Sequence, residues 1–164
     1  TRTEQGDLRQ VIHAGQGDYP RLVVAPCDLE ECFYETFKAF NLADKYQLPA
    51  FILSDKYLGE AAKTIEPFDE SGLEIDRGKL VNEVSEDYKR YEITEDGVSP
   101  RVLPGTENGI HLATSYEHNE YGFHTEVPAE RDAMMEKRMR KMEGLLKDLD
   151  PPEIFGPRMR KRLL

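Results

Sequence analysis

The chain has 164 residues, of which 38% are hydrophobic and 33% charged, and its formal net charge at pH 7 is −10. This length suits one domain with a real core, and no stretch approaches the ~20 apolar residues of a membrane span. Because nucleic-acid phosphates are bound by clustered Lys and Arg, the acidic balance argues against nucleic acid as a general partner. We therefore expect a cytoplasmic protein that binds neither nucleic acid nor membrane.

The chain opens with TRTEQGDL, without an initiator Met. A secretory signal would need an apolar run of about 7–15 residues near the start. The first apolar cluster is the short run 22–25. We expect Thr1 to lie inside a longer polypeptide.

Residues 21–55 predict a strand, a helix and a second strand. The apolar run 22–25 ends at Pro26, as expected for a strand buried on both faces. Asp28, with Glu31 three residues later, resembles a capping box at a helix start. Pro49 ends the helix and the apolar run 50–53 follows. Such a unit predicts parallel strands in a layered α/β domain with helices flanking the sheet.

The predicted helix has one apolar face at helical spacing, which we expect to be buried. It consists of Leu29, Cys32, Phe33, Phe37, Phe40 and Ala43. The pairs Cys27-Asp28 and Ser54-Asp55 follow the two strands, where α/β folds place their ligands. For Asp28, a simple role as helix cap is favoured over ligand binding.

Residues 68–128 are rich in Gly, Pro, Asp and Glu and lack sustained periodicity. So long an irregular excursion is usually functional or bound to a partner, so its order is expected to depend on a neighbour. A short strand or hairpin is expected around Tyr91 and Ile93. After Pro128 the sequence predicts a second helix that ends at Pro151-Pro152.

The second helix carries an apolar stripe of Met135, Met139, Met142 and Leu146. A Met-rich stripe indicates core or subunit-interface packing more often than a cofactor site. The terminal PRMRKRLL is interpreted as a solvated connection into a following strand, with a nucleic-acid tail as the minor alternative. The two cysteines, Cys27 and Cys32, have no second pair for a zinc site and are expected to be reduced structural thiols.

The stretch GIHLATSYEHNEYGFHTE gathers several groups that could ligate a metal ion. They are His111, Glu117, His118, Glu120 and His124. Their spacing matches neither an i, i+4 His pair on a helix nor a calcium loop, so polar packing beside an active site is favoured over a metal site. Arg2 and Arg101 lie in nonperiodic stretches where a guanidinium could be held for a carboxylate, although exposed arginines are the simpler interpretation.

Five stretches in register resemble the alpha subunit of the 2-oxoacid:ferredoxin oxidoreductases, closest to the 2-oxoglutarate type. They are TRTEQGDL, LVVAPCDLEECFYETFKAFNLADKYQLPAFILSDKYLGE, YKRYEITEDGVSPRVLPG, HLATSYEHNEYG and MEKRMRK. The resemblance implies a partial thiamine diphosphate-binding fold. Residues 1–157 would be the C-terminal part of the pyrimidine-binding domain, and residues 158–164 the start of a connection to a following domain.

The resemblance also implies an activity: oxidative decarboxylation of a 2-oxoacid, with the acyl group passed to coenzyme A and electrons to ferredoxin. Thiamine diphosphate, Mg²⁺ and a 4Fe-4S cluster would be held mainly by a beta subunit. The glutamate that binds the cofactor's aminopyrimidine ring would precede Thr1, so no catalytic residue is expected in this chain, which would be inactive alone.

The same resemblance points to substrate-binding residues. Arg2 would clamp the distal carboxylate of 2-oxoglutarate, Thr3 would orient it, and Arg101 and His111 would line the entrance. Two positions depart from the family pattern: Cys27 stands where Gly is usual, which puts close ligand approach in doubt, and Asn119 stands where Asp is usual, which weakens a metal role further. The alternative is a non-catalytic α/β module that docks a partner subunit.

Overall fold

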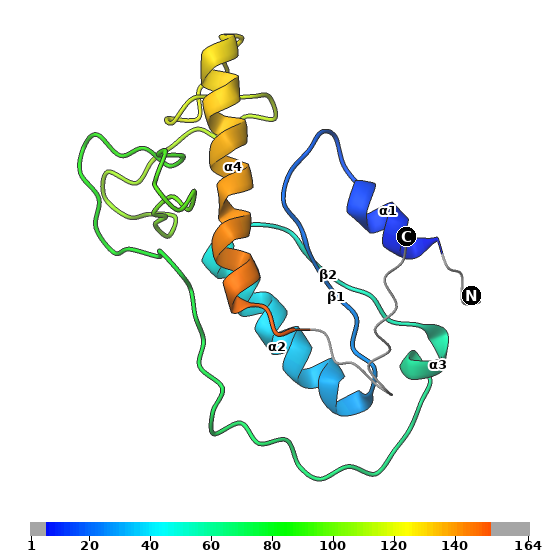
Figure 1. Cartoon of the computed structure of the whole chain (residues 1–164). Helices are drawn as coiled ribbons and strands as arrows, with labels where there is room; N and C mark the ends of the chain where they lie inside the picture. Colours follow the sequence, from blue (N-terminus) through cyan, green and yellow to red (C-terminus); the bar gives the residue numbers. More distant parts are fainter. Residues whose placement is uncertain (1–5, 152–164) are drawn as a thin grey trace.

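The computed structural model describes residues 6–151 (Figure 1). In chain order its elements are α1 (Asp7–His13), β1 (Leu22–Val24), α2 (Leu29–Tyr46), β2 (Ala50–Ile52), α3 (Lys56–Gly59) and α4 (Pro128–Asp148).

β1 and β2 form a two-stranded parallel sheet joined by α2. The register aligns Leu22 with Ala50 and Val24 with Ile52. Because parallel neighbours need a crossover connection, the chain must leave the sheet after β1 and return through a helix. The predicted strand–helix–strand unit with flanking helices is confirmed.

Local sequence signals set both ends of α2. The Asp28 carboxylate accepts a hydrogen bond from the backbone N–H of Glu31 at 2.8 Å, and the Glu31 carboxylate accepts one from the N–H of Cys27 at 2.6 Å. These two hydrogen bonds satisfy the amide of Glu31 in the first helical turn and the amide of Cys27 just before the helix. At the other end Gln47 adopts a left-handed conformation with φ of 50°, which stops the helix before Pro49.

The buried face of α2 differs from the predicted one. Its buried residues are Ala39, Leu42 and Tyr46, whereas Phe40 is 70% exposed. The prediction was wrong at Phe40. The preceding residue in the helix, the small Ala39, faces the core instead. Phe33 stacks on Phe68 of the irregular segment, with ring centroids 4.1 Å apart.

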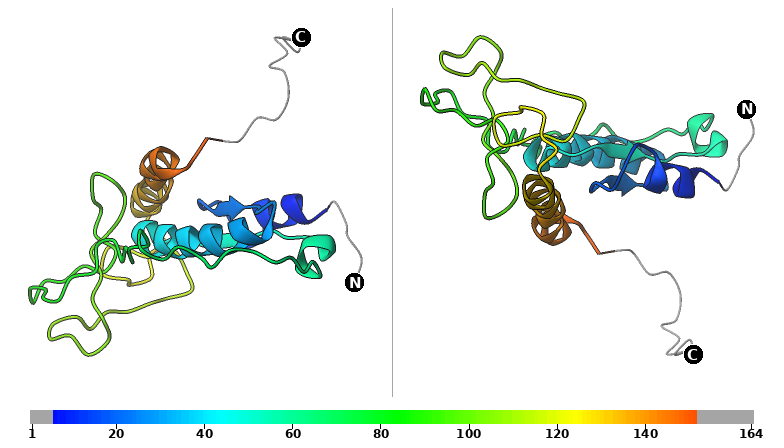
Figure 2. Two further views of the ribbon diagram at one scale, coloured as in Figure 1. Left: turned by 90° about the horizontal axis from the view of Figure 1, so that it is seen from below. Right: turned by 90° about the horizontal axis from the view of Figure 1, so that it is seen from above.

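α4 crosses α2 near the C-terminal end of α2, as the views in Figures 1 and 2 agree. Tyr46 occupies the crossing: its hydroxyl donates to the Asp148 carboxylate at 2.7 Å. Burial, and then this hydrogen bond, raise the pKa of the Tyr46 phenol. The hydrophobic core is centred here and consists of Leu22, Ala39, Leu42, Tyr46, Leu48, Val98 and Leu145.

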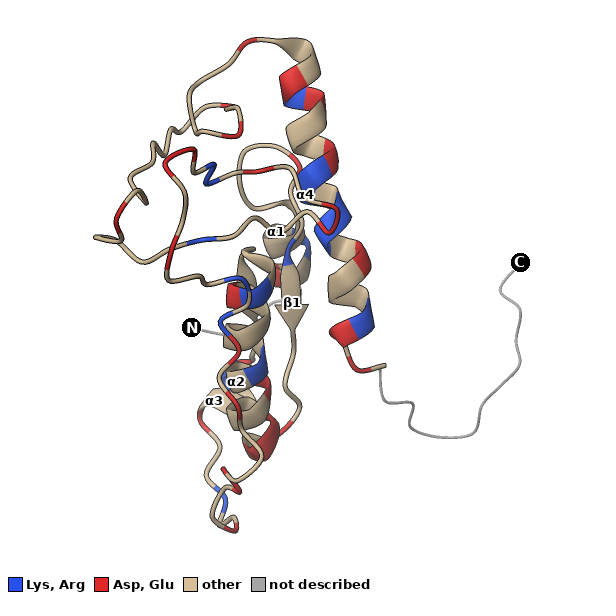
Figure 3. Ribbon diagram, turned by 90° about the vertical axis from the view of Figure 1, so that its left-hand side faces the viewer, with Lys and Arg blue, Asp and Glu red and all other residues tan. Residues whose placement is uncertain are grey.

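The buried side of α4 is also rotated from the predicted one. Met134, Lys137, Lys141 and Leu145 are buried. Of the stripe predicted to pack in the core or at a subunit interface, Met142 packs against the core, whereas Leu146 is 63% exposed and Met139 is also exposed. The buried residues lie about one position before those of the predicted stripe, which corresponds to a rotation of roughly 100° around the helix axis. Figure 3 shows Lys and Arg gathered on the middle turns of α4.

Between α3 and α4 the described chain forms no further helix or strand, only two isolated bridges, Leu80 with Arg101 and His118 with His124. The predicted long irregular excursion is confirmed. The strand predicted around Tyr91 and Ile93 is not formed, because these backbone amides bond individually to Glu120: Tyr91 to its carbonyl at 2.9 Å and Ile93 to its carboxylate at 2.9 Å.

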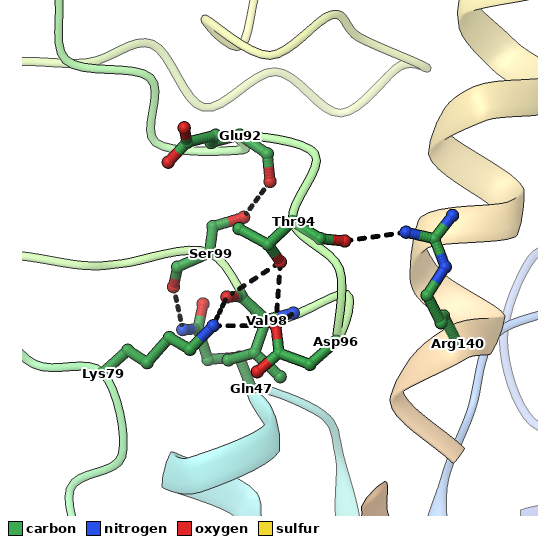
Figure 4. A network of polar contacts seen from close by, with 8 residues as sticks. All are labelled: Gln47, Lys79, Glu92, Thr94, Asp96, Val98, Ser99 and Arg140. Carbon is green, nitrogen blue, oxygen red and sulfur yellow. Dashed lines mark hydrogen bonds and ion pairs between the residues drawn. The ribbon is translucent and has the colours of Figure 1, made fainter. Parts of the chain in front are cut away.

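A polar network fixes the turn 94–99 between α2 and α4 (Figure 4). The Asp96 carboxylate accepts from the Thr94 hydroxyl at 2.9 Å and from Lys79 at 2.7 Å. Arg140 of α4 donates to the Thr94 carbonyl at 2.7 Å, and Gln47 at the end of α2 donates to the Ser99 carbonyl at 2.6 Å. Side chains thus supply the order that regular backbone pairing supplies elsewhere.

Candidate functional site: the cleft at the carboxyl ends of the strands

A cleft of about 620 Å³ lies where both strands end. It is lined by Asp7 and Leu8 of α1, Ala25, Pro26 and Cys27 after β1, Leu53, Ser54 and Asp55 after β2, and Tyr57 and Leu58 of α3. Parallel strands bring their carboxyl ends to one edge of a sheet, and α/β proteins bind ligands there. The cleft contains Cys27 and both members of Ser54-Asp55, as the sequence predicted.

The aspartates after the two strands act as helix caps. Asp28 caps α2, and the Asp55 carboxylate accepts from the N–H of Leu58 at 2.7 Å. Each satisfies an amide at a helix start, which is the common role of Asp in this position. Capping, the favoured interpretation of Asp28, is confirmed.

The chemistry of the cleft fits an uncharged ring better than a diphosphate. Among the described residues that line it, none is Lys or Arg, while Asp7 and Asp55 are acidic. Leu8, Leu53, Leu58 and Tyr57 supply apolar surface. A thiamine diphosphate could therefore rest its aminopyrimidine ring against this chain, with its diphosphate held by other groups.

The substrate-binding residues inferred from the resemblance fall in three places. Arg2 and Thr3 lie outside the described residues, four or more positions before the cleft residue Asp7. Arg101 is away from the cleft: its guanidinium lies 3.1 Å from the Asp44 carboxylate of α2. His111 is exposed, with its Nδ1 3.0 Å from the Gly109 carbonyl. Neither Arg101 nor His111 lines the cleft.

The histidine-rich stretch packs through polar contacts. Within residues 6–151 no group of three or more His, Cys, Asp or Glu side chains is arranged to hold a metal ion. The His118 ring lies 4.0 Å from the Tyr91 ring, centroid to centroid. Glu117 pairs with Arg138 at 2.5 Å and Glu120 with Lys89 at 3.2 Å. Its acidic groups thus serve to hold the irregular segment together and to attach it to α4.

Two features were not found from the sequence. The first is the burial of Lys137 and Lys141 on α4, which the sequence placed outside its apolar stripe. Segments distant in sequence cover them, among them Gln47, Tyr91 and the turn that contains Gly97, and no local pattern encodes that packing. The second is the contribution of α1 to the cleft through Asp7 and Leu8.

None of the helices within residues 6–151 combines the length and apolar character needed to cross a bilayer. Neither Cys27 nor Cys32 takes part in a disulfide bond there.

Comparison with known proteins agrees with this geometry. Residues 1–137 match the family model described as pyruvate flavodoxin/ferredoxin oxidoreductase, thiamine diP-bdg. The chain is 45% identical over 145 residues to subunit alpha of 2-oxoacid:ferredoxin oxidoreductase 2 from Aeropyrum pernix, covering 87% of this chain and 22% of the relative. It is 30% identical over 124 residues to 2-oxoglutarate synthase subunit KorA from Methanothermobacter thermautotrophicus, covering 75% of this chain and 32% of the relative.

A solved structure is similar over nearly the whole chain. It is the 2-oxoglutarate:ferredoxin oxidoreductase from Magnetococcus marinus with 2-oxoglutarate, coenzyme A and succinyl-CoA bound, with a TM-score of 0.86 and 39% identity over 94% of this chain and 27% of that one. The chain thus spans between a fifth and a third of the length of these relatives. Its sheet and helices are part of a thiamine diphosphate-binding fold. The chain belongs to the alpha subunits of the 2-oxoacid:ferredoxin oxidoreductases.

Proposed function

We propose that this chain forms part of an alpha subunit that, with its partner chains, oxidatively decarboxylates 2-oxoglutarate to an acyl-coenzyme A and passes the electrons to ferredoxin. The likeness to the Magnetococcus marinus enzyme, which extends along almost all of the chain, carries the proposal. The relative named 2-oxoglutarate synthase subunit KorA supports the same substrate class. The enzyme would act in the cytoplasm.

Within that enzyme the cleft between α1, α3 and the strand ends would face the aminopyrimidine ring of thiamine diphosphate. Thiamine diphosphate, when bound, supplies the carbanion-stabilising chemistry that decarboxylation needs. The residues of this chain would contact the ring and exclude water through Leu8, Leu53 and Leu58. A beta subunit would hold the diphosphate, Mg²⁺ and the 4Fe-4S cluster, in keeping with the lack of basic residues among the described residues of the cleft.

For substrate recognition we propose the arginine that precedes α1. The Arg2 guanidinium would form a two-pronged hydrogen bond with the distal carboxylate of 2-oxoglutarate, oriented by Thr3. Arg101 and His111 are kept as weaker candidates for the entrance, because their side chains already contact Asp44 and Gly109.

The proposal is tested with the intact alpha subunit purified with its partner chains. Reduction of ferredoxin is followed with 2-oxoglutarate, pyruvate and 2-oxoisovalerate in turn, each with and without coenzyme A. The expected result is coenzyme A-dependent reduction with the highest kcat/KM for 2-oxoglutarate. Equal or higher kcat/KM for pyruvate would reject the substrate assignment.

Arg2→Ala and Arg2→Lys in the same complex test the role of the guanidinium. Losing a bidentate charged contact of about 2–3 kcal/mol should lower kcat/KM for 2-oxoglutarate by roughly 30- to 150-fold. Pyruvate, which has no distal carboxylate, should be affected much less. Arg2→Lys should recover only part of the loss, because an ammonium cannot match the planar fork. An unchanged preference for 2-oxoglutarate over pyruvate in Arg2→Ala would show that Arg2 does not bind the distal carboxylate.

A second candidate is a non-catalytic module that docks a partner subunit. It is favoured by the exposed apolar residues of α4, Met139 and Leu146. A complex that assembles with its partner chains but reduces no ferredoxin with any of the three oxoacids would support this candidate instead.

A further inference from the structure

Two lysines on α4 are withdrawn from solvent. Lys137 is 5% exposed and Lys141 is 9% exposed. Lysine is almost never buried to this extent unless its ammonium group is paired. The spacing of four residues places both side chains on one face of the helix, so the two positive charges lie close together.

These lysines line a small cavity of about 170 Å³. Its walls come from four separate parts of the chain: Gln47 at the end of α2, the neighbours Arg90 and Tyr91, His118, and α4. The Arg90 guanidinium lies 5.2 Å from the centroid of the Tyr91 ring, and the Lys137 ammonium lies 6.0 Å from the same centroid. Four Lys and Arg side chains thus converge on one cavity: Arg90, Lys137, Arg138 and Lys141. Of these, Arg138 is already paired with Glu117.

The other three basic groups have no counter-ion among the described residues. In the part of the chain that the structure describes, Lys137 and Arg90 form no ion pair, and Lys141 donates only to a neutral group, the Gln47 carbonyl, at 2.9 Å. Burial, and then the neighbouring positive charges, lower the pKa of Lys137 to about 7. Burial lowers the pKa of Lys141 to about 8.

Nearby carboxylates are already paired elsewhere. The pairs are Glu117 with Arg138 at 2.5 Å, Glu120 with Lys89 at 3.2 Å and Asp96 with Lys79 at 2.7 Å. The backbone N–H of Ile93 also donates to Glu120. None of these carboxylates lines the cavity. A buried cation without a partner is costly, so an anion bound in this cavity would be stabilised.

We propose that the cavity formed by Arg90, Lys137 and Lys141 binds a small oxyanion of the phosphate class. Three cationic groups suit a dianion better than a monoanion, and charge-assisted hydrogen bonds to phosphate oxygens are among the strong ones. The volume admits a single phosphoryl group and is too small for a whole nucleotide. The site is separate from the cleft at the strand ends, with which it shares no lining residue.

The first test uses thermal unfolding of the intact alpha subunit with its partner chains, in buffer of constant ionic strength. Inorganic phosphate and methyl phosphate are compared with chloride. A ligand that binds only the folded protein raises its melting temperature, so a rise of a few degrees is expected with at least one phosphate probe. A rise with inorganic phosphate indicates a free anion site, and a rise with methyl phosphate alone indicates a phosphoryl group carried by a larger molecule. No rise with either probe would overturn the proposal.

Lys137→Met and Lys141→Met remove one charge each while keeping most of the length of the side chain, and both should abolish the rise. Lys147→Met is the matched control, because Lys147 is exposed on the same helix and does not line the cavity. It should preserve the rise. A phosphate response unchanged in Lys137→Met would reject the site.

The second test needs no variant. Amine acetylation of the wild-type complex at pH 8 is measured residue by residue by mass spectrometry, with phosphate or chloride present. A bound anion raises the pKa of Lys137, and a rise from about 7 to about 9 lowers the neutral, reactive fraction of its amine at pH 8 from about nine-tenths to about one-tenth. Acetylation of Lys137 should therefore fall about tenfold with phosphate, while that of Lys147 stays constant. Equal acetylation of Lys137 in both buffers would mean a neutral, unliganded lysine and would overturn the proposal.

Discussion

Gly97 lies where the irregular segment passes against α4, and Gly97→Ala should separate the two. Gly97 has φ of +78°, and an added Cβ would lie 2.3 Å from the Lys137 carbonyl oxygen and 3.2 Å from the Lys141 backbone nitrogen. Since real Cβ atoms stay beyond 3.0 Å, the backbones must part by at least 3.0 − 2.3 = 0.7 Å. The left-handed conformation alone costs about 1–2 kcal/mol, and the clash should bring the total to roughly 3–4 kcal/mol.

The assay is amide hydrogen exchange on the intact alpha subunit, read at residues 94–99 and 137–145. It reports local opening, which a global unfolding transition of a long multidomain chain does not. A loss of about 3 kcal/mol should speed exchange at these amides by roughly a hundredfold.

Gly105→Ala is the matched control. Gly105 has φ of +93° with nothing within 4 Å of an added Cβ, so it carries the backbone strain without the clash. Exchange in Gly105→Ala should change only around residue 105. If Gly97→Ala exchanges at 137–145 no faster than Gly105→Ala, the packing of the irregular segment on α4 is refuted.

Two further changes test the crossing of α2 and α4 and the buried charge. Tyr46→Phe removes a hydrogen bond to the Asp148 carboxylate. It should lower the free energy of local opening of both helices, measured by hydrogen exchange, by about 2 kcal/mol; unchanged exchange would contradict the contact. Lys137 has a pKa of about 7 in the folded protein against an ordinary value of 10.5. Between pH 7 and 10.5 the unfolded chain therefore binds more protons than the folded chain, so the free energy of unfolding should rise with pH. In phosphate-free buffer Lys137→Met should lose this rise and be more stable than wild type below pH 7, and parallel melting-temperature profiles of the two proteins would contradict this.

Features encoded by near neighbours in sequence were predictable. Asp28 and Glu31 lie in one helical turn, and Pro49 stops the chain where α2 ends. The apolar runs define both strands, and the rule that parallel strands end at one sheet edge places Cys27 and Ser54 in one cleft. All of these inferences need only local geometry and one topological rule.

Features set by distant contacts were not predictable. The buried faces of α2 and α4 depend on how the turn 94–99 packs, and that turn is fixed by Lys79, Gln47 and Arg140, which lie far apart in sequence. Periodicity identified each helix but not its buried face, because Phe40 and Ala39 are both apolar neighbours on the helix surface. The lysine burial followed from the same long-range packing.

The most direct test of the account is the activity of the complex when the cleft is filled. Ser54→Trp places a large ring among the residues that line the cleft, and Ser71→Trp places the same ring on an exposed part of the irregular segment. With 2-oxoglutarate and coenzyme A, Ser54→Trp should lose at least about tenfold in ferredoxin reduction and need more thiamine diphosphate for half-maximal activity, while Ser71→Trp should match wild type. Wild-type activity and thiamine diphosphate requirement in Ser54→Trp would contradict the placement of the cofactor ring in this cleft.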